Sequence, residues 1–408
     1  MTEHCGVHAG EVHRHASALR VLMLVTNYPY PVVGGLERQA HELAKSLRAI
    51  GTRVQVISNS IAPRQTAQEA VEGIPVERIP WPKRRWARFP RAALDLSQRL
   101  YRRRREYDVL HIHQPGWFGL FSIMLARAYG KPVLTKLPGT IGMAGTTAHA
   151  WGRFKLRVLR CSDAIVVMSR ESMDELLAIG FPACRILACP NGITCDDMSV
   201  SPQAGTQLCR VAFVGRLSQE KNVDVLLTAW KKVLTRVNCR CRLELWGSGP
   251  LESALRHQCS ELGITDSVCF HGYVPGVREQ LPGSDILVLP SRSEGNSNAL
   301  LEAMAAGLPV VATRVGGTPM LMGSEWAGFL CEPGDAGALA DRLLALIHDP
   351  ELRERMGRAL RRRVEQFFVM QHIAATYAAA YRFLATGQRD RISEASNSVV
   401  LDEAGCVA

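Results

Sequence analysis

The stretch from residue 286 to residue 312 reads ILVLPSRSEGNSNALLEAMAAGLPVVA and contains one complete supersecondary unit. Its apolar start predicts a buried strand over Ile286–Pro290. A polar loop with a glycine follows, and Asn298–Ala306 then has the composition of a helix that ends at Gly307. The apolar run Pro309–Ala312 predicts a second strand. A strand, a helix and a strand in this order are typical of a parallel β–α–β unit.

The same alternation runs through the rest of the chain. Short apolar runs such as Leu19–Thr26 and Arg53–Ser58 predict strands, and segments such as Leu36–Ile50 between them have helical periodicity. Strands rich in Val, Ile and Leu throughout are typical of parallel sheets buried on both faces. We therefore predict an α/β protein with two Rossmann-like, doubly wound parallel-sheet domains that face each other across a cleft.

The alternation is interrupted around Pro190–Gly192 and again at residues 201–206, where turn-forming residues predict a linker. The predicted segments are a disordered tail at 1–18, an N-terminal domain at 19–195, a C-terminal domain at 206–365, a helix at 366–385 that packs back towards the N-terminal domain, and a disordered tail at 386–408. We expect the carboxyl ends of both sheets to face the cleft.

The composition limits the class of protein. The chain has 408 residues, of which 47% are hydrophobic, and no apolar run reaches the ~18 residues that a membrane span needs. Its twelve cysteines are scattered without metal-finger spacing, and the first residues do not resemble a secretion signal. These features predict a cytoplasmic protein with free thiols and no metal site.

The net charge of +11 is concentrated in the first half of the chain. Residues 1–190 carry 27 Lys and Arg against 14 Asp and Glu, whereas the remainder carries 22 against 24. In residues 81–105 cations alternate with tryptophan and phenylalanine, which is typical of a segment at a membrane surface. A solvated basic helix is the alternative. We expect an anionic membrane surface as the partner and no nucleic acid, because no nucleic-acid motif accompanies these charges.

Two carboxylates flank the predicted helix start in the opening stretch. Glu294 lies in the loop at the carboxyl end of a strand, and Glu302 lies within the helix that follows. The helix N-terminus favours a phosphate, and Gly295 allows a ligand to approach the backbone. A ligand with sugar hydroxyls at both ends and a diphosphate in the middle fits this pattern. The alternative is that both glutamates are ordinary surface charges.

Two loops after other predicted strands add to this pattern. Arg216 and Lys221 follow the strand Cys209–Val214 and can supply fixed positive charge to a diphosphate. Gly247 and Gly249 follow the next strand and would bring backbone close to a ligand. Solvated surface cations are the alternative for Arg216 and Lys221.

With these motifs the sequence resembles glycosyltransferase family 4, whose members have the GT-B fold. The matching stretches are Gly34-Gly35-Leu36-Glu37-Arg38, Pro190-Asn191-Gly192, Val214–Ser218 with Lys221-Asn222, Gly247-Ser248-Gly249-Pro250, Pro290-Ser291, Glu294-Gly295, Leu301–Ala305 and Gly307–Ala312. The resemblance extends over most of the chain and is most specific in the C-terminal domain.

The resemblance implies a nucleotide-sugar donor bound mainly by the C-terminal domain. Arg216 and Lys221 would hold the diphosphate, Glu302 would bind the ribose hydroxyls, and Glu294 would contact the donor sugar. We take Glu294, Arg216 and Lys221 as the candidate catalytic residues. The other donor-binding residues that the resemblance implies are Gly34, Gly35, Gly247, Gly249, Val274 in the loop beside the base, Gly295, Asn296, Ser297 and Asn298.

The family retains the anomeric configuration of the sugar and generally needs no metal, because cations and the helix end neutralise the leaving diphosphate. The resemblance therefore implies no cofactor, and an acceptor that is a glycan or lipid-linked glycan of cell-surface polysaccharide or glycolipid synthesis. Many members carry a histidine in the loop after the fourth strand, where this chain has Pro138. Lys136 is a candidate to replace it. His113 is a second candidate on the acceptor side, with a structural role as its alternative.

Two other functions are compatible with a two-domain architecture. A nucleotide-sugar epimerase shares it, and a non-catalytic nucleotide-sugar-binding protein would keep the cleft. A dehydrogenase is disfavoured, because Glu252 stands where the third glycine of a dinucleotide-binding turn would be.

Overall fold

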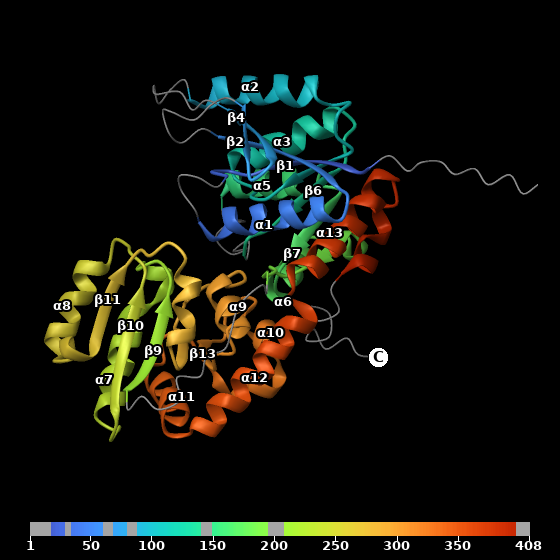
Figure 1. Ribbon diagram of the computed structural model, residues 1–408. Coiled ribbons are helices and arrows are strands. Elements are labelled where there is room, and N and C mark those ends of the chain that lie inside the picture. Colours follow the sequence, from blue (N-terminus) through green and yellow to red (C-terminus); the bar gives the residue numbers. More distant parts are fainter. Residues whose placement is uncertain are drawn as a thin grey trace, which may run out of the picture.

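The computed structural model of the chain describes residues 18–28, 34–59, 68–79, 88–139, 149–194 and 208–396. Its strands form two separate sheets, of eight and six strands, which lie in two domains (Figure 1). Neighbouring strands are parallel in both sheets except for the pair β3–β4 at one edge. The predicted architecture of two doubly wound α/β domains is therefore confirmed. None of the described helices combines the length and the hydropathy needed to cross a membrane.

The first sheet has the strand order β3-β4-β2-β1-β5-β6-β7-β8. Its strands are β1 Arg20–Leu24, β2 Arg53–Asn59, β3 Gln68–Val71, β4 Ile74–Ile79, β5 Val109–Ile112, β6 Val133–Lys136, β7 Ala164–Val167 and β8 Ile186–Ala188. The helices that follow these strands are α1 Gly35–Ala49, α2 Arg88–Arg102, α3 Trp117–Ala128, α5 Ala150–Leu159 and α6 Arg170–Ala178. Because the order runs outward from β1 in both directions, the sheet has a switch point between β1 and β5.

Strand β1 shows why this sheet is buried on both faces. Val21 and Met23 pack with α1 and α13, whereas Leu22 and Leu24 pack in the cluster that contains the apolar residues of α2, α3 and α5. Alternate side chains of a strand point to opposite faces, so a strand that is apolar throughout needs a helical layer on each side.

The second sheet has the strand order β11-β10-β9-β12-β13-β14, with its switch point between β9 and β12. Its strands are β9 Leu208–Val214, β10 Arg240–Trp246, β11 Val268–Gly272, β12 Ile286–Leu289, β13 Val310–Thr313 and β14 Leu330–Cys331. The helices of this domain are α7 Val223–Leu234, α8 Glu252–Leu262, α9 Asn298–Ala305, α10 Thr318–Met322, α11 Ala336–His348 and α12 Pro350–Phe367. The two loops predicted to hold Lys221 and Glu294 leave the strands on either side of this switch point.

The chain returns to the first domain at its C-terminal end. Helix α12 leads to α13 (Met370–Ala385), which runs up to the first domain and packs against α1 (Figure 1). At this crossing the backbone N–H of Ile193 donates to the Phe368 carbonyl at 2.8 Å, and that of Met370 donates to the Ile193 carbonyl at 2.9 Å. Tyr381 on α13 then reaches the buried His111 of β5, with 2.6 Å between Oη and Nδ1.

The prediction that disorder begins at residue 386 was wrong for the first part of that tail. Residues Arg389–Ala395 form a short 3₁₀ helix against the first domain. Ile392 is fully buried, the Asp390 carboxylate accepts a hydrogen bond from Arg185, and Ser396 accepts one from the backbone of Ala188. A single apolar anchor in a polar segment gives almost no periodicity, so composition alone suggests disorder. Residues 397–408 and 1–17 lie outside the described residues.

Candidate active site

The loop after β12 and the start of α9 form the centre of the site. Ser297 caps α9 by accepting a hydrogen bond from the Leu300 N–H at 3.4 Å, so the helix begins where the sequence predicts. Its first backbone N–H groups favour a negatively charged ligand. Gly295 and Asn296 precede the cap. Glu294 lies in the loop before this helix start, and Glu302 lies within the helix.

Lys221 and Glu294 are in direct contact. The Lys221 Nζ lies 2.5 Å from the Glu294 Oε1, and the Ser291 hydroxyl donates to the same oxygen at 2.7 Å. Both side chains are largely buried, with 22% and 10% of their surface exposed. They meet because their loops leave β9 and β12, the two strands at the switch point of the second sheet.

Arg216 is exposed on the loop after β9. Gly247 and Gly249, on the loop after β10, pack against the backbone of this Arg216 loop. A Cβ added to Gly247 would lie 1.9 Å from the Gly215 carbonyl oxygen, and one added to Gly249 would lie 2.2 Å from that of Leu217. We expected these glycines to admit a ligand. In the structure both glycines are required for contact between two backbone segments, and this contact holds the loop that presents Arg216.

Glu302 is buried within α9, at 7% exposure, and is therefore not a solvated helix charge. Burial raises the pKa of its carboxyl group, an effect opposed by the positive charges of Arg38 and Arg278. Arg38 of helix α1 in the first domain donates to the Glu302 Oε1 at 2.9 Å. Sequence reasoning did not identify Arg38 as a site residue, although it ends the Gly-Gly-Leu-Glu-Arg motif.

Asn191 of the first domain connects the two domains at the start of α9. Its Nδ2 donates to the Asn296 carbonyl at 3.1 Å and to the Asn298 Oδ1 at 3.0 Å, and its Oδ1 accepts from the Lys136 Nζ at 2.9 Å. Asn298 in turn donates to the carbonyl of Gly35 at 2.9 Å, the first residue of α1, directly after Gly34. Four predicted site residues thus form one hydrogen-bonded chain across the cleft. Asn191 was assigned to a linker, because Pro-Asn-Gly is also a turn signal.

Replacing Asn191 with alanine should destabilise the arrangement of the two domains. The change removes three side-chain hydrogen bonds and leaves the Lys136 ammonium buried without its acceptor. Because an unsatisfied buried polar group costs about 1–3 kcal/mol, we expect a loss of at least that size and a clear fall in Tm. The exposed Asn238 provides the control, since its replacement by alanine should leave Tm unchanged. Equal Tm values for the two variants would contradict a structural role for Asn191.

The proline that replaces the family's histidine lies against the site. A Cβ on Gly295 would be 1.8 Å from the Pro138 carbonyl oxygen, and the Gly139 Cα would be 3.3 Å away. The first-domain loop therefore approaches Gly295 as closely as a glycine permits. Residues 140–148, which continue this loop, lie outside the described residues.

The two acceptor-side candidates are both buried. His113 is 4% exposed, and its ring centroid lies 4.0 Å from that of His111. Burial lowers its pKa, and the positive charge of Lys136 lowers it further. Burial also lowers the pKa of Lys136 from its ordinary 10.5 to about 8. A lysine with this pKa changes charge near physiological pH.

Lys136 should also make stability depend on pH in a defined direction. The folded protein releases this proton near pH 8 and the unfolded chain near 10.5, so the group disfavours folding by roughly 3 kcal/mol below pH 8, and this cost disappears as the pH rises to 10.5. The difference in Tm between Lys136→Met and the wild type should therefore be most in favour of the variant at pH 7. It should be least in favour of the variant near pH 10. Lys232→Met, at an exposed position, is the control. A Tm difference that does not vary with pH would contradict the shifted pKa.

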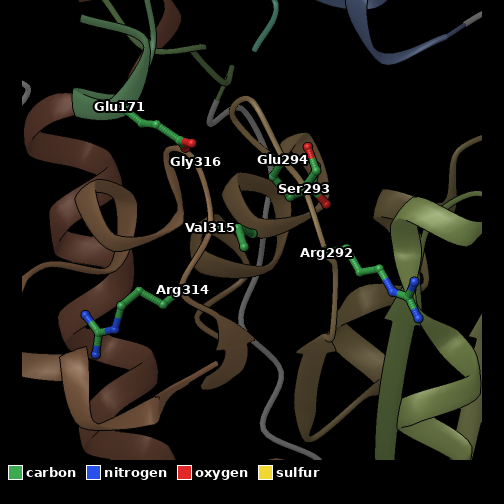
Figure 2. A pocket seen from close by; sticks show the side chains of 7 residues that line it. All are labelled: Glu171, Arg292, Ser293, Glu294, Arg314, Val315 and Gly316. Atoms are coloured by element: carbon green, nitrogen blue, oxygen red, sulfur yellow. The ribbon is translucent and has the colours of Figure 1, made fainter. Parts of the chain in front are cut away.

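A pocket of about 460 Å³ opens beside Glu294. Its lining residues are Glu171, Arg292, Ser293, Glu294, Arg314, Val315 and Gly316 (Figure 2). Glu171 comes from α6 of the first domain and points towards Gly316, so both domains contribute to the pocket. Nothing in the sequence pattern had indicated Glu171.

Val274, predicted to lie beside the base, is half-buried in the loop after β11.

One group among the described residues has the composition of a metal site. The donor atoms of Glu244, Cys269 and His271 lie within 4.8 Å of one another. The His271 ring is hydrogen-bonded to the Glu244 carboxylate and stacks on Trp246 at 3.7 Å between centroids, which accounts for its position without an ion.

Comparison with known proteins identifies both domains. Residues 34–192 match the family described as glycosyl transferase 4-like domain, and residues 202–363 match glycosyl transferases group 1. Among curated relatives, the N-acetyl-alpha-D-glucosaminyl L-malate synthase of Bacillus anthracis is 27% identical over 86% of this chain and 94% of its own length. The phosphatidyl-myo-inositol mannosyltransferase of Mycobacterium leprae is 29% identical over 81% of this chain and 88% of its own.

Solved structures share the fold. HepE of Anabaena in complex with UDP and glucose matches with a TM-score of 0.73 and 21% identity, over 89% of this chain and 99% of its own. Sucrose-phosphate synthase of Thermosynechococcus elongatus matches with a TM-score of 0.75 and 20% identity, over 90% of this chain and 100% of its own. Two family matches that together take in most of both domains, relatives that are named glycosyltransferases and the shared architecture agree. The chain therefore belongs to the group 1 glycosyltransferases of the GT-B fold, with a glycosyl transferase 4-like N-terminal domain.

Proposed function

We propose that the chain moves a sugar from a nucleotide-diphosphate sugar, with UDP or GDP as the nucleotide, to a glycan or lipid-linked glycan acceptor, with retention of configuration. The observation that carries this proposal is the contact between Lys221 and Glu294 beside the N-terminus of α9, with Glu302 buried further along the same helix. A cation, a helix end and two carboxylates are the groups that a diphosphate between two polyols requires.

Each group has a distinct part in the proposed reaction. Lys221, Arg216 and the first N–H groups of α9 stabilise the negative charge that develops on the leaving diphosphate oxygen as the glycosidic bond breaks. Glu294 accepts hydrogen bonds from the donor sugar, and Glu302 accepts them from the ribose. The acceptor hydroxyl attacks the anomeric carbon from the face that the diphosphate leaves, and its proton passes to the departing diphosphate oxygen. Attack on this face retains the configuration. In this proposal the fixed cations take the place of a catalytic metal.

The relatives support the donor and acceptor classes. HepE is described in complexes with UDP-glucose and with UDP and glucose, and the name of the Mycobacterium leprae relative includes a phosphoinositide lipid. We propose for this chain a cytoplasmic role in cell-surface polysaccharide or glycolipid synthesis. An epimerase or a non-catalytic binding protein remains the alternative, and both would bind the donor without forming a new glycosidic bond.

The donor class is tested by a thermal-shift screen with UDP, GDP and their sugar derivatives. A ligand that binds only the folded protein raises its Tm by an amount that grows with its concentration above Kd. We expect one nucleotide series to raise Tm and the other to have little effect. The reaction is tested by NMR of the product, in which a retaining transferase keeps the anomeric configuration of the donor. If no nucleotide raises Tm, the proposed function fails.

A further inference from the structure

We infer that the outer surface of helices α2, α3 and α5 docks onto an anionic membrane. Helix α3 contacts both α2 and α5, and the three lie on the face of the first sheet opposite α1 and α13. Nine large apolar side chains are exposed in the described part of the chain. Six of them are on these three helices and form what we call the apolar surface: Leu94, Tyr101, Trp117, Met124, Trp151 and Phe154. Such a concentration on one face marks an interaction site.

A stacked pair of indole rings lies at one end of the apolar surface. Trp117 at the start of α3 and Trp151 at the start of α5 stack with 3.8 Å between centroids, and Phe154 lies 5.4 Å from Trp151. The two tryptophans are nevertheless 58% and 42% exposed. Amphipathic indole rings are the side chains that proteins place at the level of lipid headgroups.

The charge around the apolar surface selects the partner. The three helices hold eight Lys and Arg residues and one acidic residue, Asp95. Two of the eight, Arg99 and Arg127, pair with the buried acids Glu77 and Asp163 and are therefore not available to a partner. Arg153 and Arg157 are exposed on α5 beside the aromatic rings, and Arg104 lies 3.9 Å above the Tyr101 ring. A second copy of this chain would bring cation against cation, which disfavours self-association. An anionic bilayer offers both negative headgroups, worth about 1 kcal/mol per cation, and an apolar phase for the exposed rings.

The position of the apolar surface links it to the site. Trp117 is the first residue of α3, which follows β5, and Trp151 lies in the first turn of α5, which follows β6. Both tryptophans therefore lie at the carboxyl edge of the first sheet, where His113 and Lys136 also lie. A membrane bound here would lie beside the entrance of the cleft. Resting on the proposed function, this placement indicates an acceptor that is presented from the lipid phase.

The test measures sedimentation of the full chain with vesicles of phosphatidylcholine. A second set of vesicles also contains roughly 30–40% phosphatidylglycerol, which gives them a strong negative surface potential. We expect binding to anionic vesicles that weakens in high salt. Trp151→Ser combined with Phe154→Ser should raise the lipid concentration for half-maximal binding about tenfold or more, which corresponds to roughly 1.4 kcal/mol. Leu177→Ser, an exposed leucine on α6, is the matched control and should bind as the wild type does.

A second variant tests the charges without touching the aromatic pair. Arg102→Ser with Arg105→Ser changes two exposed side chains and spares Arg103, which is paired with the buried Glu77. It should weaken binding to anionic vesicles and leave Tm unchanged. Equal vesicle binding by the wild type and both variants would overturn the inference. So would a dimer that the aromatic variant dissociates. Because vesicle binding needs no donor and the thermal-shift screen needs no lipid, failure here is distinguishable from failure of the proposed function.

Discussion

Replacing Lys221 with alanine is expected to lower kcat/KM about 30- to 150-fold. The ammonium group would contact the donor diphosphate, and a hydrogen bond between charged groups contributes ~2–3 kcal/mol to the stability of the charged transition state. The same change leaves Glu294, 10% exposed, with only the Ser291 hydroxyl among the partners described above. Steady-state kinetics with the nucleotide sugar found by thermal shift measure the effect.

Lys232 on α7 supplies the matched control for this prediction. It is an exposed lysine in the same domain, outside the loops of the site, so Lys232→Ala should keep wild-type kinetics. Lys221→Arg keeps the charge and should recover part of the lost activity. If Lys221→Ala turns over as fast as Lys232→Ala does, Lys221 has no part in binding the leaving group.

Glu302→Gln should lower kcat/KM by about 10- to 100-fold, mainly through a higher KM for the donor. A carboxylate can accept two hydrogen bonds from neighbouring ribose hydroxyls, whereas an amide offers one oxygen acceptor, and a hydrogen bond to a charged group is worth ~1.5–3 kcal/mol. Because burial of this carboxylate raises its pKa, a neutral amide of the same shape should not lower Tm. Activity and stability are thus predicted to separate.

The exposed Glu354 on α12 is the matched position, with 62% of its side chain exposed. Glu354→Gln should change neither KM nor Tm. Arg38→Ala gives a further readout, because Arg38 pairs with Glu302. If Arg38 and the donor compete for the Glu302 carboxylate, this variant should have a lower KM for the donor. If both bind the carboxylate together, its KM for the donor should be higher. An unchanged KM for the donor in Glu302→Gln would show that the ribose does not bind this carboxylate.

The pattern of apolar runs predicts most of what brings Lys221 to Glu294. Strands that are apolar throughout indicate parallel pairing, and parallel sheets bind ligands at their carboxyl edge, so the two loops could be placed in one region from sequence alone. The strand order that makes them direct neighbours is a property of the whole sheet and has no local signal.

Contacts between the domains could not be predicted in the same way. Arg38 and Glu302 are 264 residues apart, and neither the periodicity of α1 nor that of α9 indicates the other. Asn191 gives the signal of a turn, which it also is, while its hydrogen bonds depend on where the second domain lies. The antiparallel pair β3–β4 was missed for a different reason. Its turn residues Glu72 and Gly73 both have positive φ, and glutamate is rarely used there.

The parallel bridge between Ile193 and Val369 has a consequence for how the two domains can move. The polypeptide leaves the first domain and comes back to it at almost the same point in space, so this point can act as a pivot. Each domain can then rotate about this point. Sliding or full separation would break the two backbone hydrogen bonds that join Ile193 to Phe368 and Met370. Opening for substrate entry should therefore be a rotation of the two domains about Ile193.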